Sequence, residues 1–322
     1  LSENLFEGLS PWMQKLPGGL IHVNVVGCAI FAAISGSSAA TVATVGKMSI
    51  PELRKRNYPE KILLGSLAGS GTLGLLIPPS IILIIYGVTV QESIAKLFIA
   101  GIFPGIMIAI IFMTYVVIWS LMNKNKMPIL TEEIPYIEKI KKSGKLIPVI
   151  LLIISVIGSI YSGVATATEA ASLGVVGALI LSFFQKSLTI DSFKKSLLGA
   201  TKTSCMIGFI LAGSTFLSLA MGFTGLPRNL AIWIDTMQLS PYILIIVLMI
   251  FYIILGMFLD GISAVVLTMA IIEPMIRQAG FDMIWFGIFL VVVVEMAQIT
   301  PPVGFNLFVL QGMAEKDMGY IA

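Results

Sequence analysis

The chain has 322 residues, of which 57% are hydrophobic and 11% are charged, and its mean hydropathy is +0.99. A soluble domain carries about a quarter charged residues, so this composition excludes a protein whose surface lies mostly in water. The formal net charge of +3 is small, and the positions of the basic residues are more informative than their sum.

The apolar segments predict an all-α polytopic membrane protein. Most of them reach the roughly 17–25 residues that a helix needs to cross a ~30 Å hydrocarbon layer. The first repeat, 1–122, is predicted to hold a hairpin at 17–56, a broken helix at 60–88 and a helix at 97–122. After a hydrophilic cytoplasmic linker at 123–145, the second repeat, 146–322, is predicted to hold helices at 146–163, 167–185 and 199–222, a hairpin at 240–278 and a broken helix at 283–312.

The two repeats are recognised by a shared pattern, a Gly/Ser-rich break followed by a Pro-Pro pair. From Gly36 to Pro78 is 42 positions, and from Gly261 to Pro301 is 40 positions. Internal repetition of interrupted helices is typical of secondary transporters. Breaks of this kind leave backbone groups unpaired, which is tolerable at membrane depth only beside protein or a water-filled cavity. We therefore interpret the first part of each repeat as a re-entrant hairpin and the Pro-Pro segment as two half-helices.

The distribution of basic residues supports an inverted arrangement. Five full crossings separate the hairpins, so the second repeat has the opposite orientation. With this topology 17 of the 20 Lys and Arg residues fall on one side, and the other three are Lys96, Arg228 and Arg277. Basic residues concentrate on the cytoplasmic side of a membrane protein. The first hairpin is therefore predicted to open from the cytoplasm and the second from the opposite face.

Two short segments, Ser187–Leu198 and Leu226–Gln238, are too short and mixed to span, and Trp233 in the second is typical of an interface-lying helix. Cys28 and Cys205 lie in apolar runs and are expected to be packed thiols, and His22 is expected to be a packing residue. No spacing typical of a zinc or other transition-metal site is present.

Broken helices place dipole ends at membrane depth, where N-termini attract anions and freed carbonyls attract small cations. Pro78-Pro79 would free carbonyls near Gly74 and Ile77, and Ser35 and Ser37 add hydroxyl oxygens. We predict a first sodium site there. A second sodium site is predicted in the other repeat at Asp260, Ala297, Gln298, Thr300 and Pro302.

Hydroxyl and amide groups near these breaks could bind an anionic substrate beside the helix dipoles. The candidates are Ser37, Ser38, Thr72, Ser80, Ser263 and Asn306. Glu169 and Glu295 also lie in apolar segments, where an ionisable group is a functional candidate. Glu169 lies near the non-cytoplasmic end of its segment, which favours an interfacial position, whereas Glu295 lies deeper and close to the second break.

Gly69, Gly71 and Gly74 match G-x-G-x-x-G, but that nucleotide fingerprint must follow a strand and open a helix. Here it lies inside an apolar segment, so the glycines are predicted to permit tight helix contact. The sequence contains no Walker lysine, zinc spacing or nucleophile elbow, so we do not expect an enzyme or an ATPase.

Several segments resemble the large membrane subunit (M-type, DctM-like) of tripartite ATP-independent periplasmic (TRAP) transporters, and the likeness runs essentially end to end. These segments are Gly19–Val25, Ser35–Thr41, Leu76–Ile81, Tyr86-Gly87, Ala100–Gly105, Thr168–Ala171 and Thr300–Asn306. Family members normally carry further membrane helices at both ends, so we expect this sequence to be part of a longer protein.

The resemblance implies an elevator-type, sodium-driven carrier of the cell inner membrane with no cofactor other than its coupling ions. Its implied partners are a small four-helix membrane subunit and a periplasmic substrate-binding protein. Carried over by position, the family's cation-binding regions fall on Ser35, Ser37, Gly74, Ile77 and Pro79, and on Asp260, Thr300 and Pro302.

Three other classes remain as alternatives. A stand-alone sodium-coupled dicarboxylate or citrate carrier would need no binding protein, a channel would need a continuous polar path, and a membrane enzyme would need an acid/base or metal constellation. The substrate is expected to be an organic acid, and C4-dicarboxylates, sialic acid and other sugar or keto acids all remain open.

Overall fold

The computed structural model describes residues 2–128, 135–225 and 240–321, together with positions 229, 232 and 236. Every regular element within these residues is a helix, which confirms the all-α prediction. Among the described residues, six helical stretches are long and apolar enough to cross a membrane. They are Glu60–Val90, Ile94–Met122, Tyr136–Tyr161, Ala167–Phe184, Ile190–Thr224 and Gly261–Gln278.

The first repeat begins with α1 and continues through a helical hairpin and an interrupted helix. Its elements are α1 (Ser2–Met13), α2 (Ile21–Ser35), α3 (Ser38–Lys55), α4 (Glu60–Gly71), α5 (Leu73–Leu76), α6 (Ile81–Val90) and α7 (Ile94–Met122). Pro78 and Pro79 lie between α5 and α6. The helix is interrupted there because proline lacks the backbone N–H and clashes with the preceding turn.

The connection to the second repeat is partly helical. It contains the short helices η1 (Lys124–Lys126), α8 (Tyr136–Ser143) and η2 (Gly144–Leu146). Within its described residues α8 packs on α1, where Trp12 Nε1 donates to Ser143 Oγ at 2.7 Å. The second part of the predicted hydrophilic linker, α8 and η2, therefore packs against the start of the chain.

The second repeat begins with three helices and repeats the hairpin and the interruption. Its elements are α9 (Ile147–Tyr161), α10 (Ala167–Phe184), α11 (Ile190–Thr224), α13 (Pro241–Gly256), α14 (Gly261–Gln278), α15 (Met283–Gln298), α16 (Phe305–Ala314) and α17 (Met318–Ile321). The interface helix predicted at 226–238, including Trp233, lies outside the described residues apart from the three single positions.

Helix α11 differs from the sequence-based expectation. The structure shows one continuous helix of 35 residues from Ile190 to Thr224, whereas 187–198 was predicted to be a separate short segment. No proline lies between Ile190 and Thr224, and Thr189 and Ser192 form a capping box that starts the helix early. At 1.5 Å per residue the helix is about 52 Å long, which exceeds the hydrocarbon layer.

The helix boundaries define the internal repeat more closely than the glycines do. Helices α3 and α14 both have 18 residues, and the shift from Ser38 to Gly261 is 223 positions. The same shift maps Pro78 onto Pro301 and the start of α4 onto the start of α15. The predicted alignment of Gly36 with Gly261 is therefore wrong by two positions. The equivalent residues are the N-caps Ser37 and Asp260.

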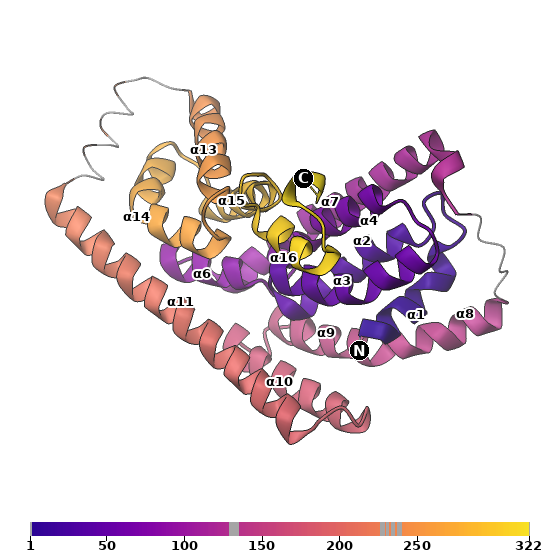
Figure 1. Ribbon diagram of the computed structural model, residues 1–322. Coiled ribbons are helices and arrows are strands. Elements are labelled where there is room, and N and C mark those ends of the chain that lie inside the picture. Colours follow the sequence, from indigo (N-terminus) through magenta and orange to yellow (C-terminus); the bar gives the residue numbers. More distant parts are fainter. Residues whose placement is uncertain are drawn as a thin grey trace.

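The repeats interlock around two hydrophobic cores. Helix α2 packs on α4, and α13 packs on α15, so each hairpin contacts the first half of its own interrupted helix. Helix α3 packs on α16, and α14 packs on α6, so each hairpin also contacts the last half-helix of the other repeat (Figure 1). Leu307 and Leu310 of α16 accordingly lie in the core of the first hairpin, and Leu83 and Tyr86 of α6 lie in that of the second.

Helices α9, α10 and α11 lie at the edge of this interlocked unit (Figure 1). Their outer faces carry exposed apolar side chains such as Leu151, Val175 and Phe209. Helix α11 contacts α14 through Ser214, whose hydroxyl donates to the Val266 carbonyl at 2.7 Å. Cys205 on α11 is exposed within the chain, so the expectation of a packed thiol is correct for the buried Cys28 and wrong for Cys205.

Candidate functional site

The tip of the first hairpin is built from a glycine turn and a serine cap. Helix α2 ends at Ser35, and Gly36 takes the left-handed conformation with φ 60°. Ser37 caps α3, its side chain accepting from the Ala40 N–H. Ser35 Oγ lies 2.7 Å from Thr41 Oγ1, and Thr41 donates to the Ser37 carbonyl at 2.8 Å. Thr41 was not predicted, although it lies one turn beyond the Ser37 cap on the same helix.

This tip packs directly on the first Pro-Pro break. The Gly36 carbonyl accepts from the Ile81 N–H at 3.2 Å, and a Cβ on Gly36 would lie 2.8 Å from the Pro79 oxygen. A Cβ on Gly74 would lie 2.6 Å from the Ser37 oxygen. Four of the five residues predicted for the first sodium site, namely Ser35, Ser37, Gly74 and Pro79, are therefore brought together.

The fifth residue of that set, Ile77, directs its side chain elsewhere. A Cβ on Gly105 of α7 would lie 2.9 Å from Ile77 Cγ1, so the Ile77 side chain packs on α7. Only a backbone group of Ile77 could therefore serve the predicted site.

The second hairpin tip has a carboxylate cap where the first has a hydroxyl. Asp260 Oδ2 accepts from the N–H groups of Ile262 and Ser263, both at 3.1 Å, and Oδ1 accepts from the Ser263 hydroxyl. These bonds satisfy the orphan donors at the start of α14. Both Asp260 oxygens thus have a structural role. Oδ2 already accepts two N–H bonds, so the remaining acceptor capacity for a cation is on Oδ1.

This second tip packs on the end of α15. A Cβ on Gly256 would lie 2.6 Å from Ala297 Cβ, and one on Gly261 would lie 3.0 Å from Gln298 Nε2. Ala297 and Gln298 therefore adjoin the tip as predicted for the second sodium site. Thr300, just after α15, instead donates to the Met296 carbonyl of α15 at 2.6 Å, and Pro302 is exposed.

The two tips meet at Gln298. The buried Ser38 hydroxyl at the start of α3 donates to Gln298 Oε1 at 2.6 Å, joining residues 260 positions apart. Gly261 lies against the same Gln298 amide and also against Ile82 at the start of α6. The starts of α3, α6 and α14 thus adjoin the end of α15, a contact that was not predicted although both Ser38 and Gln298 were candidates.

The remaining substrate candidates divide into two groups. The hydroxyls of Thr72, Ser80 and Ser263 are used within their own segments, donating respectively to Gly69, Leu75 and Asp260. Asn306, in the first turn of α16, is fully buried, and neither side-chain polar atom has a hydrogen-bond partner among the described residues. Buried polar groups normally have partners, so Asn306 is the strongest substrate or ion candidate of the six.

The two glutamates of the apolar segments have different environments. Glu169 is exposed and forms a capping box with Thr166 at the start of α10, which agrees with the interfacial interpretation. Glu295 of α15 is buried, and its Oε1 has no hydrogen-bond partner among the described residues. An uncompensated buried carboxylate is costly, so Glu295 stays a functional candidate.

The glycines of the G-x-G-x-x-G segment serve helix packing. A Cβ on Gly69 would touch the Phe112 ring, one on Gly71 would overlap Val42, and one on Gly74 would overlap Ser37. The prediction that they permit close contact is confirmed.

His22 is buried, with Nε2 2.8 Å from the Pro17 oxygen, as expected for a packing residue. Across the described residues no group of three His, Cys, Asp or Glu side chains could hold a metal ion.

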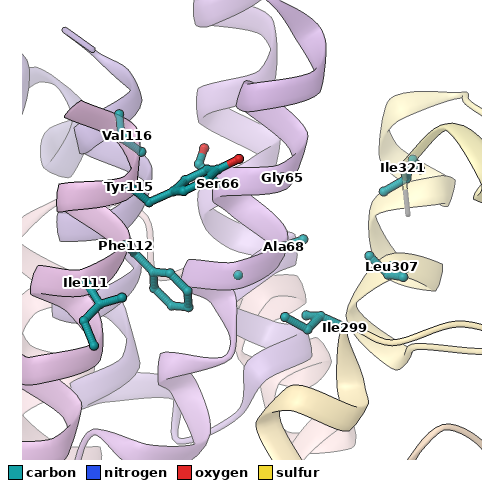
Figure 2. A pocket seen from close by; sticks show the side chains of 11 residues that line it. Gly65, Ser66, Ala68, Ile111, Phe112, Tyr115, Val116, Ile299, Leu307 and Ile321 are labelled. Carbon is teal, nitrogen blue, oxygen red and sulfur yellow. The ribbon is translucent and has the colours of Figure 1, made fainter. Parts of the chain in front are cut away.

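A cavity of about 410 Å³ lies between α4, α7 and the last helices (Figure 2). Its wall is mostly apolar and includes Ala68, Phe112 and Leu307, with Ser66 and Tyr115 as polar members. None of the predicted cation or substrate residues lines it.

The interlocked repeats, the six apolar spans and the polar tips at the centre define a multi-pass α-helical membrane protein with two interrupted helices. A family model for the "Tripartite ATP-independent periplasmic transporter, DctM component" matches residues 1–322. The chain therefore belongs to the DctM family of TRAP transporter large permeases, and it is a multi-pass protein of the cell inner membrane.

Three relatives illustrate the likeness. The chain is 35% identical over 321 residues to the C4-dicarboxylate TRAP transporter large permease protein DctM of Pseudomonas aeruginosa. The matched region covers 99% of this chain and 74% of that protein. It is 32% identical over 322 residues to the isethionate TRAP transporter permease protein DctMQ of Oleidesulfovibrio alaskensis, covering 99% and 50%. It is 33% identical over 302 residues to the 2,3-diketo-L-gulonate TRAP transporter large permease protein YiaN of Escherichia coli, covering 93% and 70%.

Proposed function

We propose that this chain moves an organic acid across the inner membrane by sodium-coupled secondary transport. It would receive the acid from a periplasmic binding protein and work with a small four-helix membrane subunit. The observation that carries the proposal is the meeting of both hairpin tips at the Ser38–Gln298 hydrogen bond. One polar centre is thereby shared by two repeats.

The helix ends at this centre support binding of both an anion and a cation. The starts of α3 and α14 adjoin Gln298, the start of α6 adjoins Gly261, and helix N-termini favour negative charge. The ends of α2, α5 and α15 contribute carbonyl oxygens, which favour sodium. The Ser35 and Asp260 groups are the proposed side-chain ligands of the two sodium sites.

The substrate class follows from the same chemistry and from the relatives. The named substrates of the relatives are C4-dicarboxylate, isethionate and 2,3-diketo-L-gulonate, which share an anionic group. We propose a small organic anion of this kind, including C4-dicarboxylates and sugar acids such as sialic acid, held by helix dipoles and hydroxyl groups.

The arrangement of the helices also fits an elevator mechanism. Hairpins α2–α3 and α13–α14 and the interrupted helices share two cores, so they would move as one body. Helices α9 to α11 expose apolar faces and would contact lipid and the small subunit as part of the scaffold. The hairpins would then be re-entrant, the first opening from the cytoplasm and the second from the periplasm.

The test is uptake of a panel of labelled organic acids into proteoliposomes that contain the full-length protein and its small subunit. Uptake that requires both a sodium gradient and the binding protein is the expected result. Sodium-dependent uptake without any binding protein would instead favour a stand-alone carrier, and uptake that is indifferent to sodium would contradict the proposal.

Asn306→Leu is expected to lower the uptake rate about tenfold while leaving the thermal unfolding temperature unchanged or higher. The substitution removes a buried amide that has no partner among the described residues, and such a group costs about 1–3 kcal/mol. Asn24→Leu is the matched control, because the buried Asn24 amide donates to Leu63 and Ser66 and its loss should destabilise the protein. Normal uptake by Asn306→Leu would remove Asn306 from the site.

A further inference from the structure

Arg54 links the outer end of the first hairpin to the other repeat. It lies in the last turn of α3, about 24 Å along the helix from Ser38 at the tip. Its Nε donates to Glu60 Oε1 at 3.1 Å, and its Nη2 donates to the carbonyl of Ala314 at 2.8 Å. Ala314 is the last residue of α16, which belongs to the second repeat.

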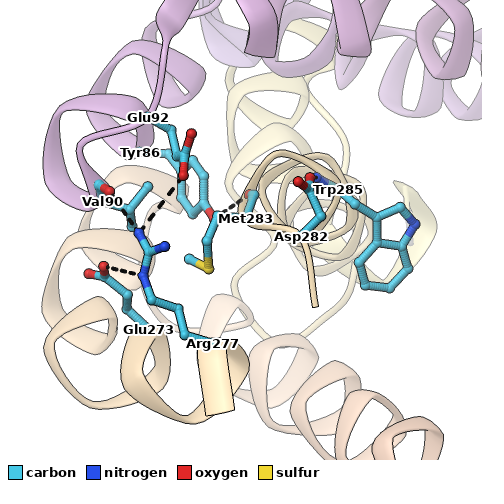
Figure 3. A network of polar contacts seen from close by, with 8 residues as sticks. All are labelled: Tyr86, Val90, Glu92, Glu273, Arg277, Asp282, Met283 and Trp285. Atoms are coloured by element: carbon cyan, nitrogen blue, oxygen red, sulfur yellow. Dashed lines mark hydrogen bonds and ion pairs between the residues drawn. The ribbon is translucent and has the colours of Figure 1, made fainter. Parts of the chain in front are cut away.

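Arg277 makes the reciprocal link from the second hairpin. Figure 3 shows its guanidinium group between the Glu273 carboxylate and the end of α6. Nε donates to Glu273 Oε1 at 2.9 Å, and Nη2 donates to the carbonyl of Val90 at 3.2 Å. Val90 is the last residue of α6, which belongs to the first repeat.

The internal symmetry relates these two links helix by helix, with α16 shifted from α6 by 224 positions, one more than the shift between α3 and α14. The shift of 223 positions that maps α3 onto α14 also maps Arg54 onto Arg277. The half-helices α6 and α16 both have 10 residues, and each is followed by a left-handed C-cap, Gln91 at φ 57° and Glu315 at φ 55°. Each arginine therefore donates to the last carbonyl of the equivalent half-helix in the opposite repeat.

The physical role of such a contact is specific. The last carbonyls of a helix lack intrahelical partners, and a cation near them is favourable. Exposed ion pairs contribute little, and both arginine side chains are partly exposed, at 39% and 47%. The contact that distinguishes them is therefore the arginine-to-carbonyl bond between repeats, which uses the fork of donors that lysine lacks.

We propose that Arg54 and Arg277 are a symmetry-related pair of positioning residues. Each fastens the outer end of one hairpin to the half-helix of the other repeat, and together they keep both tips seated against the Pro-Pro breaks. The effect on transport rests on the proposed function, whereas the fastening itself does not.

The fastening is tested by hydrogen exchange of the full-length protein in lipid nanodiscs with its partner subunit. Arg54→Ala is expected to speed exchange about tenfold in α16 and the end of α3, with α6 unchanged. Arg277→Ala is expected to do the same in α6 and the end of α14, with α16 unchanged. Arg56→Ala is the matched control, because Arg56 follows α3 directly and pairs with Glu52 of the same helix. Unchanged exchange in the opposite repeat would overturn the proposal.

Lysine variants and uptake kinetics separate positioning from general stability. Arg54→Lys and Arg277→Lys keep the charge but not the fork, so their exchange should remain closer to the alanine variants than to the wild type. Uptake by the alanine variants should show a KM raised several-fold, with the maximal rate changed less than about twofold. Full rescue by lysine, or a lower maximal rate at unchanged KM, would contradict the proposed role. If the wild-type protein shows no uptake but Arg54→Ala speeds exchange in α16 and Arg277→Ala speeds it in α6, the fastening would be retained and the proposed transport function rejected.

Discussion

Replacing Gly36 by alanine is expected to lower the initial rate of organic-acid uptake at least about tenfold. Gly36 has a φ of 60°, a conformation that costs a residue with a side chain about 1–2 kcal/mol. An added Cβ would also lie 2.8 Å from the Pro79 carbonyl oxygen, which is backbone and cannot rotate away. The tip would have to withdraw from the break. An increase of about 1.4 kcal/mol in the activation free energy of transport already lowers the rate tenfold.

Gly163→Ala separates conformational strain from the clash. Gly163 has a φ of 72°, and no atom lies within 4 Å of the position that its Cβ would take. We expect this variant to lose stability slightly and to retain near-normal uptake. Uptake by Gly36→Ala that equals that of Gly163→Ala would show that the contact between tip and break is unimportant.

Loss of the Ser38–Gln298 hydrogen bond is expected to have a similarly large effect. Ser38→Ala would leave the Gln298 oxygen buried without its donor, and Gln298→Ala would leave the hydroxyl buried without its acceptor. Each unpaired group costs about 1–3 kcal/mol, so each variant should lower uptake about tenfold. The double variant should be no worse than the more damaging single variant, because the two residues act through one bond.

The double-mutant cycle is measured by initial uptake rates at fixed sodium and substrate concentrations. Ser155→Ala is the control, since the exposed Ser155 hydroxyl donates only to Leu152 of its own helix. Strictly additive losses for Ser38 and Gln298 would show that the bond does not couple the repeats during transport.

The overall architecture could be predicted because its signals are local. Apolar runs of membrane-spanning length and the breaks at Gly36 and Pro78 can each be recognised from a short stretch of sequence. The chemistry of helix N-caps also explains where the predicted alignment of the repeats was wrong. Ser37 and Asp260 are equivalent caps, but serine and aspartate do not align by identity, so the glycines beside them set a register two positions away.

The contacts that build the centre could not be predicted, because they join distant residues. Ser38 and Gln298 were both candidates, yet nothing local indicates that an α3 hydroxyl meets an α15 amide across 260 positions. The same applies to Arg54 and Arg277, which look like ordinary surface charges until α16 and α6 are placed beside them. The α11 error has another origin, since its polar first turns are compatible with a helix that extends beyond the hydrocarbon layer.

The central claim, that the shared centre binds sodium that drives uptake, is tested most directly by sodium titration of uptake. The proteins compared are the wild type, Ser35→Ala and Asp260→Asn, with Asp282→Asn as control. Asp282 is also a helix N-cap, accepting from Trp285 N–H at 2.8 Å, but it caps α15 at the end away from Gln298. A half-saturating sodium concentration raised about tenfold in the two tip variants and unchanged in the control is the predicted result. Unchanged sodium dependence in both tip variants would contradict the account.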